Sequence, residues 1–257
     1  MLTGERKDQL LKSVELLLQA RRTAKPIAHL PAEWTPASME EVYFMQDTIA
    51  GHFGEPGGWK IGAPDPQATP LFAPMPAEWM AGSGATLGGS MRRFRGLEAE
   101  IAFLLGSDLP PRDTPYSREE VVAAIASCHP VIEELETAFE DPKACGRFSM
   151  MADMQMHGGF VYGPAAQNWQ ALDFATESVA LTVDGAVRVQ ATGSNTSGTD
   201  LVRLVVWLAN EGASRTGGLK AGDWVTTGSW TGNTLASAGS RVEASFSNAG
   251  KVSLQFA

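Results

Sequence analysis

The stretch GLEAEIAFLLG, residues 96–106, is apolar almost throughout, yet it carries two glutamates, Glu98 and Glu100, separated by a single residue. In a β-strand, residues i and i+2 point to the same face, so both carboxylates would project to one side with their Cα atoms roughly 6–7 Å apart. The apolar run that follows, residues 101–105, is typical of a strand buried on both faces. These residues therefore predict a strand that bears a pair of acidic side chains on one face.

Two explanations account for this acidic pair. An amphipathic strand with one solvated face is the simpler explanation, since it needs no ligand. If that face is buried instead, the two carboxylates repel each other and lose their hydration, so their burial requires a cation or raised pKa values. A metal site at Glu98 and Glu100 is the second explanation, and it requires further ligands.

A third acidic residue follows in HPVIEELE, residues 129–136. Pro130 begins an extended segment there, and Glu133 on a neighbouring strand can meet the first two glutamates. Three carboxylates suit a hard divalent cation such as Mg²⁺, Mn²⁺ or Ca²⁺ better than they suit zinc. The alternative is that Glu133 belongs to a solvated run of charge with Glu134 and Glu136, and the spacing leaves both explanations open.

Composition and charge narrow the class of protein. The chain has 257 residues, of which 44% are hydrophobic and 19% are charged, as is typical of a globular protein with a sizeable core. The formal net charge is −9, and basic residues cluster only in short pieces such as RRFR at 92–95, which argues against a nucleic-acid partner. The two cysteines, Cys128 and Cys145, lack metal-site spacing and are expected to be reduced structural thiols.

The amino-terminal residues and the apolar runs bear on location. MLTGERKDQLLKSVELLL, residues 1–18, is charged and helical and does not resemble a signal peptide. The longest apolar runs in the sequence fall short of the eighteen or more residues that a membrane span needs. We therefore expect a cytoplasmic protein without a membrane partner.

Helical patterns come first along the chain. Apolar residues recur at helical spacing over residues 5–22. A capping box from Ser38 to Glu41 should begin a second helix that ends near Phe53. The segment GEPGG, residues 54–58, then breaks the helical pattern.

Strand-like patterns follow these helices. The 27 glycines and 15 prolines indicate many turns, and from GWKIG onward short β-like segments alternate with turn residues. We therefore expect a helical portion over residues 1–55 and a β-rich catalytic domain over residues 56–257. The two portions should form one structural unit.

Two helices and two hairpins are expected within the β-rich part. SREE, residues 117–120, is a capping box for a helix that should end near Ser127, and TDLVRLVVWLANEG, residues 199–212, predicts another helix. The Asp-Gly pair at 184–185 suits a type I′ turn between two strands. The last two strands should pair around residues 248–250.

Seven blocks of the sequence carry a resemblance to a known family. They are GWKIG (58–62), LEAEIAFLLGSDL (97–109), HPVIEELE (129–136), MADMQMHGGFVYG (151–163), VVWLANEGA (205–213), LKAGDWVTTGSWTG (219–232) and GKVSLQF (250–256). Taken together they resemble the fumarylacetoacetate hydrolase superfamily, in its branch of 2-keto-4-pentenoate hydratases and 4-oxalocrotonate decarboxylases. The resemblance implies an α+β fold like the fumarylacetoacetate hydrolase C-terminal domain, a mixed β-sheet roll with flanking helices and a helical N-terminal portion.

The resemblance also implies a metal site. The family holds Mg²⁺ or Mn²⁺ with a Glu-x-Glu pair and a third carboxylate, which fall here on Glu98, Glu100 and Glu133. In the family the ion binds a 2-oxo acid through its carboxylate and keto oxygens. A divalent ion would relieve the repulsion among the three carboxylates and stabilise the enolate that forms beside the keto group.

The resemblance assigns catalytic roles to Lys60 and Asp153. Taken alone, Lys60 would be an exposed strand residue. In a cleft with three acids it would instead hold the substrate carboxylate, or transfer a proton if burial lowers its pKa. Asp153 is the family's aspartate near the site.

Four further residues are expected to bind or shape the substrate. Gly228, Ser229 and Thr231 lie in TTGSWTG, for which an ordinary turn after a strand is the equal alternative. His157 stands where hydratases carry a small polar residue, and we expect it to line the pocket.

The sequence departs from the hydratase pattern at several positions. Thr137-Ala138 replaces the usual Ser-Arg pair, and Met154 follows Asp153 where asparagine is usual. Asp65 is the one available counterpart of a further family acid. The residues for metal binding and enolate formation are thus retained, while those that choose and protonate the distal carbons differ, which leaves the substrate open.

The implied reaction is metal-dependent addition of water to a 2-hydroxydienoate or 2-oxo-alkenoate, as in the catabolism of aromatic compounds. The alternative within the family is a decarboxylase or a C–C bond hydrolase. The hydrolases activate water with a His-x-x-Glu pair, and HFGE places His52 and Glu55 at that spacing, although a histidine at a helix C-terminus explains it more simply. An alternative of another class is a non-catalytic scaffold subunit. Members of this family usually form oligomers, so the resemblance also implies a homo-oligomer.

Overall fold

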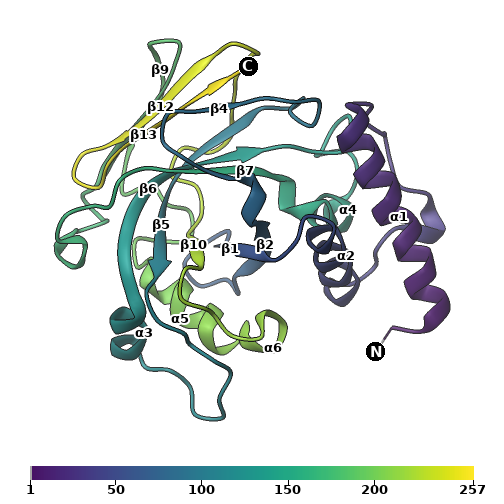
Figure 1. Cartoon of the computed structure of the whole chain (residues 1–257), viewed down its shortest axis with the longest axis horizontal. Helices are drawn as coiled ribbons and strands as arrows, with labels where there is room; N and C mark the ends of the chain where they lie inside the picture. Colours follow the sequence, from purple (N-terminus) through teal and green to yellow (C-terminus); the bar gives the residue numbers. More distant parts are fainter. Residues whose placement is uncertain (1) are drawn as a thin grey trace.

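The chain forms two mixed β-sheets, with the helices α1 and α2 side by side along one flank (Figure 1). This computed structural model describes residues 2–257. The α-helices are α1 (Gly4–Thr23), α2 (Met39–Gly51), α3 (Arg118–Ala124), α4 (Arg147–Ala152), α5 (Val202–Asn210) and α6 (Ala213–Thr216). Short 3₁₀ turns cover Ala32–Trp34, Ala77–Trp79, Met154–Met156 and Trp169–Ala171. Within the described residues, no helix is both long and apolar enough to cross a membrane.

The larger sheet carries the candidate site. Its strand order is β2-β1-β10-β5-β6-β7-β3, with β11 also paired to β5. Its strands are β1 (Pro56–Gly62), β2 (Leu71–Pro76), β3 (Met80–Gly82), β5 (Gly96–Leu105), β6 (Ile125–Leu135), β7 (His157–Tyr162), β10 (Trp224–Thr226) and β11 (Thr234–Leu235). Both parallel and antiparallel pairs occur, so the mixed sheet predicted from the resemblance is confirmed.

The smaller sheet has the order β4-β13-β12-β8-β9. Its strands are β4 (Ala85–Leu87), β8 (Ser178–Val183), β9 (Ala186–Thr192), β12 (Arg241–Phe246) and β13 (Gly250–Phe256). One continuous apolar core includes residues of both sheets together with α5, and a second core lies beneath α1, α2 and α4. The prediction of an α+β fold is confirmed.

Strand β5 has the alternation that its sequence predicts. Leu97, Ala99 and Ile101 are completely buried in the main core, while Glu98 and Glu100 occupy the opposite face. That opposite face is not freely solvated, since Glu100 is only 2% exposed. An amphipathic strand with a solvated face is therefore the wrong explanation for the acidic pair.

Three predicted helices appear close to their expected limits, and the fourth is shorter. α2 and α5 lie within the ranges predicted for them, and α1 extends one residue beyond residues 5–22 at each end. α3 has the complete capping box between Ser117 and Glu120, but it ends at Ala124 and not near Ser127. The reason is that Ile125 already belongs to β6, which pairs with β5 as far as Leu105. Strand pairing therefore ends this helix early.

The capping box predicted for α2 forms only in part. The Ser38 hydroxyl accepts a hydrogen bond from the Glu41 N–H at 3.3 Å. The Glu41 carboxylate, however, accepts from the Ala37 N–H at 2.7 Å and forms an ion pair with Arg6 of α1. Glu41, the second residue of the predicted capping box, therefore joins α2 to α1 through its ion pair with Arg6.

Both predicted hairpins are present. β8 and β9 are joined by Asp184 and Gly185, whose φ angles of 54° and 77° fit a type I′ turn. β12 and β13 pair in register from Arg241 opposite Gln255 to Phe246 opposite Gly250. Cys128 and Cys145 are free and buried, as expected of structural thiols.

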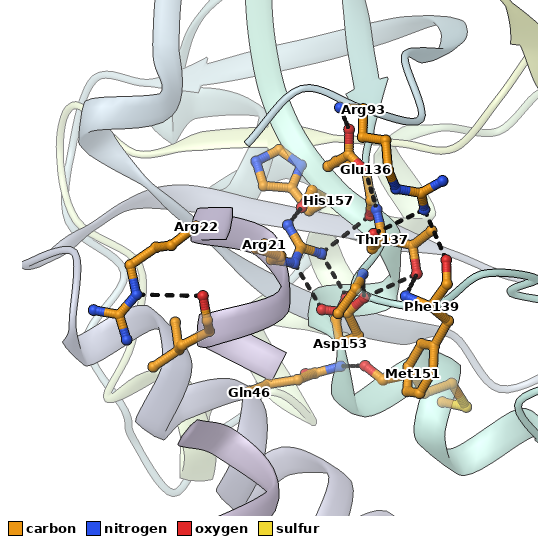
Figure 2. Close-up of polar contacts among 12 residues, drawn as sticks. Arg21, Arg22, Gln46, Arg93, Glu136, Thr137, Phe139, Met151, Asp153 and His157 are labelled. Atoms are coloured by element: carbon orange, nitrogen blue, oxygen red, sulfur yellow. Dashed lines mark hydrogen bonds and ion pairs between the residues drawn. The ribbon is translucent and has the colours of Figure 1, made fainter. Parts of the chain in front are cut away.

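A buried arginine ties α1 to the β-rich part (Figure 2). Arg21 is 3% exposed, and its Nε donates to the Asp153 carboxylate at 2.7 Å. Its Nη1 donates to the His157 carbonyl at 2.8 Å, and its Nη2 donates to the carbonyls of Glu136 and Asp153 at 3.1 Å each. One guanidinium therefore joins the end of β6, the segment after α4 and the start of β7.

We predict that Arg21→Met destabilises the whole chain. Because Asp153 is completely buried, the substitution would leave an uncompensated carboxylate, at a cost of about 3–5 kcal/mol in the free energy of unfolding. Urea denaturation followed by tryptophan fluorescence and by helical circular dichroism measures this cost. One shared transition for both signals is expected if residues 1–55 and 56–257 form one unit.

Arg22→Met is the matched control, because it removes a neighbouring arginine of the same helix. The Arg22 side chain bonds only the Leu18 carbonyl within the described structure, and we expect a change of less than about 0.5 kcal/mol. Equal stability of the two variants would contradict the anchoring role of Arg21.

Candidate metal centre and active site

Three carboxylates converge on one point of the larger sheet. Glu98 and Glu100 follow each other on one face of β5, and Glu133 lies directly opposite Glu98 on the antiparallel strand β6. One oxygen atom from each of the three carboxylates lies within 4.8 Å of the other two. Like charges directly opposite each other weaken a β-sheet, so this cluster requires compensation from other groups.

Glu133 receives two hydrogen bonds on one oxygen and none on the other. Its Oε1 accepts from Lys60 Nζ at 2.5 Å and from His157 Nδ1 at 2.9 Å. Its Oε2 is buried and has no hydrogen-bond partner within residues 2–257. Burial raises the pKa of Glu133, but Lys60 and His157 together lower it by more. The net shift is downward, and the carboxylate is ionised.

Glu98 and Glu100 are perturbed in the opposite direction. Burial, together with the charges of Glu133 and Glu98, raises the pKa of Glu100 well above its ordinary value. Burial and the charge of Glu133 likewise raise the pKa of Glu98. Glu100 is oriented by hydrogen bonds from the Thr226 hydroxyl and, at 3.0 Å, from the Gly228 N–H. Without a cation this pair therefore tends to retain protons.

Lys60 reaches the cluster from a distant strand. β1 is separated from β6 by β10 and β5, so Lys60 can contact Glu133 only because the sheet curls. Its Nζ also donates to the Gln155 carbonyl at 3.1 Å. Burial lowers the pKa of Lys60, but the contact with Glu133 and the charges of Glu133, Glu98 and Glu100 together outweigh burial, and the net shift is upward. Lys60 is thus an ammonium ion, and the lowered pKa that was the condition for proton transfer does not occur.

His157 lies behind Glu133 and is completely buried, so it does not line the cavity as expected. Burial lowers its pKa, and the neutral ring donates its Nδ1–H to Glu133, which as a carboxylate can only accept. The ring stacks on Trp79 with 5.8 Å between centroids. It therefore holds Glu133 in place from outside the cavity.

Asp153 also lies behind the cavity wall. Its second carboxylate oxygen accepts from the Thr137 hydroxyl at 3.0 Å and from the Ala138 N–H at 2.7 Å, while Arg21 holds the first (Figure 2). The Thr137-Ala138 pair that departs from the family pattern thus serves this buried network. The structure places Asp153 in a structural position, away from the three glutamates.

A cavity of about 340 Å³ opens onto the three carboxylates. Its polar lining is Lys60, Glu98, Glu100, Glu133, Arg147, Gln155, Thr196 and Ser229, and its other lining residues are Ile61, Gly62, Ala63, Pro64, Leu71, Met150, Met151 and Gly228. Gly228 and Ser229 therefore lie where the resemblance implies. Thr231 does not line this cavity, since its hydroxyl oxygen accepts from the Ala99 N–H at 3.1 Å.

Three cavity residues, Arg147, Met150 and Met151, carry no sequence motif that predicts their position. They belong to α4, a helix of six residues whose sequence, RFSMMA, has no recognisable cap or motif. Only the packing of α4 against α2 and against the 3₁₀ turn Met154–Met156 brings them to the cavity. The residue before the helix, Gly146, has a φ of 88°, which glycine adopts readily.

The remaining candidate acids and bases lie elsewhere. Asp65 accepts hydrogen bonds from the N–H groups of Gln67 and Ala68 in its own turn. His52 is at the exposed end of α2, where Nδ1 bonds the Thr48 carbonyl and Nε2 lies 3.8 Å from Glu15. Neither Asp65 nor the His52–Glu55 pair lines the cavity. A histidine at a helix C-terminus is therefore the correct explanation of HFGE.

The other two glutamates of HPVIEELE are buried and individually compensated. Glu134 is paired with the Arg92 guanidinium. The Glu136 carboxylate accepts from the N–H groups of Arg93 and Phe94 at 2.5 and 2.6 Å. The solvated charge run is therefore the wrong explanation for Glu134 and Glu136, because the segment RRFR supplies one guanidinium and two backbone N–H groups to them.

Comparison with known proteins agrees with this geometry. The family model for the fumarylacetoacetate (FAA) hydrolase C-terminal domain matches residues 41–257. A 2-hydroxyhexa-2,4-dienoate hydratase of Comamonas testosteroni is 30% identical over 159 residues, a match that spans 62% of this chain and 59% of that protein. A 2-keto-4-pentenoate hydratase of Paraburkholderia xenovorans (strain LB400) is 24% identical and covers 95% of this chain and 94% of its own length.

A solved structure shares the complete fold. The 4-oxalocrotonate decarboxylase from Pseudomonas putida G7, complexed with magnesium and adipate, superposes with a TM-score of 0.83 at 22% identity and covers 100% of this chain and 99% of its own. Another structure of that enzyme holds calcium and acetate. The family match covers most of the chain, so this protein is an enzyme that belongs to the fumarylacetoacetate hydrolase C-terminal family.

Proposed function

We propose that this protein is a metal-dependent hydratase that adds water to a 2-hydroxydienoate or 2-oxo-alkenoate in the catabolism of aromatic compounds. The observation that carries the proposal is the convergence of Glu98, Glu100 and Glu133 at the cavity, with one Glu133 oxygen left without a partner. The two relatives named as hydratases support water addition as the reaction.

The three glutamates have the properties of a site for Mg²⁺ or Mn²⁺. Their ligand atoms are all oxygens, which hard divalent cations prefer. The unpartnered Oε2 of Glu133 can coordinate a cation, and a bound cation would favour the ionised forms of Glu98 and Glu100, whose pKa values burial raises. When bound, such an ion acts as a Lewis acid that stabilises negative charge on a 2-oxo oxygen.

Lys60 provides an ammonium group beside the three glutamates. Its ammonium group is held between Glu133 and the Gln155 carbonyl, and it has one further N–H for a substrate oxygen. From this position it can hold the carboxylate of a 2-oxo acid. His157 supports this arrangement, since its hydrogen bond keeps Glu133 ionised and fixed in direction.

Decarboxylation is the second candidate, because the fold likeness to 4-oxalocrotonate decarboxylase covers the whole chain. It uses the same stabilised enolate, and release of CO₂ distinguishes it from hydration. C–C hydrolysis through the His52–Glu55 pair has no support, since that pair lies away from the cavity. A scaffold role would not require the buried acids and Lys60. A small 2-oxo acid partner, a homo-oligomeric state and a cytoplasmic location remain predictions.

The first test is Glu98→Gln. Removal of one charged ligand should weaken Mg²⁺ binding and lower the rate at which the ultraviolet absorption of a 2-hydroxydienoate disappears by about 100-fold or more. Glu243→Gln is the control, because Glu243 pairs with Lys251 on the exposed face of the smaller sheet and should leave turnover unchanged. Turnover of Glu98→Gln within a few-fold of wild type would contradict the assignment.

The stabilisation by Mg²⁺ should grow as pH rises. Because the folded pKa values of Glu98 and Glu100 are raised, their protonated forms favour folding below the ordinary glutamate pKa, and this stability is lost as pH rises through the folded values. Mg²⁺ binds the ionised forms and so competes with protons. The Mg²⁺-dependent rise in Tm should therefore be larger at pH 8 than at pH 5.5. A rise that does not depend on pH would argue against this site.

His52→Ala separates hydration from hydrolysis. Since His52 is exposed at the end of α2 and bonds only its own helix and Glu15, we expect hydratase turnover and stability close to wild type. Parallel assays of water addition and of C–C cleavage make the comparison. Selective loss of a cleavage activity in this variant would instead favour the hydrolase alternative.

A further inference from the structure

Two cations line the cavity, and they differ in what they bind. Lys60 is committed to Glu133 and to the Gln155 carbonyl. Arg147, by contrast, has an exposed side chain with no hydrogen bond or ion pair to any residue between 2 and 257. Its guanidinium is therefore available to a ligand in the cavity.

Arg147 is placed at one end of an apolar wall. It begins α4, and Met150 and Met151, three and four residues later, share its helix face and line the same cavity. The other apolar lining residues include Pro64 and Leu71. The wall therefore offers a path for a hydrocarbon chain that starts at the three carboxylates.

The other end of α4 is held by α1 and α2, and the segment after it reaches the acidic cluster through Gln155 and Lys60. Gln46 of α2 donates to the Met151 carbonyl at 2.6 Å, and Arg21 holds Asp153 directly after the helix. Gln155, two residues further on, contacts Lys60. A six-residue helix rises about 9 Å, so Arg147 lies about 9 Å along the helix axis from the end of α4 that precedes Gln155, and it lines the same cavity as the three glutamates.

We propose that Arg147 is the specificity-determining residue for a second, distal carboxylate, so that the preferred substrate is a 2-oxo or 2-hydroxydiene dicarboxylic acid. The inference rests on the proposed function, because it places the 2-oxo acid end of the substrate at Glu98, Glu100 and Glu133. A guanidinium matches a carboxylate with two parallel hydrogen bonds, which an apolar chain end cannot accept. A monoacid leaves Arg147 solvated and gains nothing from it.

Binding to the Mg²⁺-loaded protein, measured by isothermal titration calorimetry, tests this inference without turnover. 2-Oxoadipate and 2-oxohexanoate share the 2-oxo acid end and the chain length, and they differ only in whether the far end is a carboxylate or a methyl group. The wild-type protein should bind 2-oxoadipate about tenfold more tightly. 2-Oxoglutarate and 2-oxopimelate then show which chain length spans the wall best.

Arg147→Gln should reduce this preference to about one, while Arg147→Lys should retain part of it. Arg188→Gln, on the exposed strand β9, makes the same change in net charge and should leave the tenfold preference intact. Since Arg147 has no protein partner, its variants should keep the wild-type Tm. Retention of the preference in Arg147→Gln would overturn the inference.

Two outcomes separate this inference from the proposed function. If the wild-type protein binds both 2-oxo acids equally, the distal carboxylate site is wrong, but metal-dependent binding of the 2-oxo acid end stands. If neither acid nor oxalate binds in the presence of Mg²⁺, the proposed function and the inference both fail.

Discussion

The repulsion among three carboxylates on two adjacent strands is the constraint on which the site depends. Glu98 and Glu133 face each other directly across β5 and β6, and Glu100 is one step along the same face. The protein compensates them unequally. Glu133 receives Lys60 and His157, whereas Glu98 and Glu100 keep raised pKa values. This unequal compensation leaves the charge deficit that a divalent cation would fill.

Supporting contacts converge on the same cluster from all parts of the chain. Lys60 arrives from β1 because the sheet curls, and Gly228 supplies an N–H directly after β10. On the other side, Arg21 fixes the segments that flank Glu133 and His157 (Figure 2). The helix that supplies Arg21 lies outside the residues that the family model matches. The N-terminal helices are thus part of what holds the site.

Local sequence patterns predicted the secondary structure well where only neighbouring residues decide it. The Asp184-Gly185 turn and the capping box at Ser117 formed as expected, because backbone sterics and nearby hydrogen bonds determine them. The predicted end of α3 was wrong because β6 begins at Ile125, where it pairs with β5. The sequence also left open whether the acidic residues after Glu133 are solvated or buried. Glu134 is buried because it pairs with Arg92, which lies in a loop far away in the sequence.

For the site, strand alternation in the sequence indicated Glu98 and Glu100, and the resemblance of the quoted motifs to the family added Glu133 and Lys60. Only the tertiary structure decided which groups surround the cavity. It placed His157 and Asp153 behind the wall and Thr231 away from it, and it brought Arg147 to the rim on a short helix without any motif. The reason is physical: a strand's own period orients its side chains, whereas sheet curvature and helix packing determine which distant side chains meet.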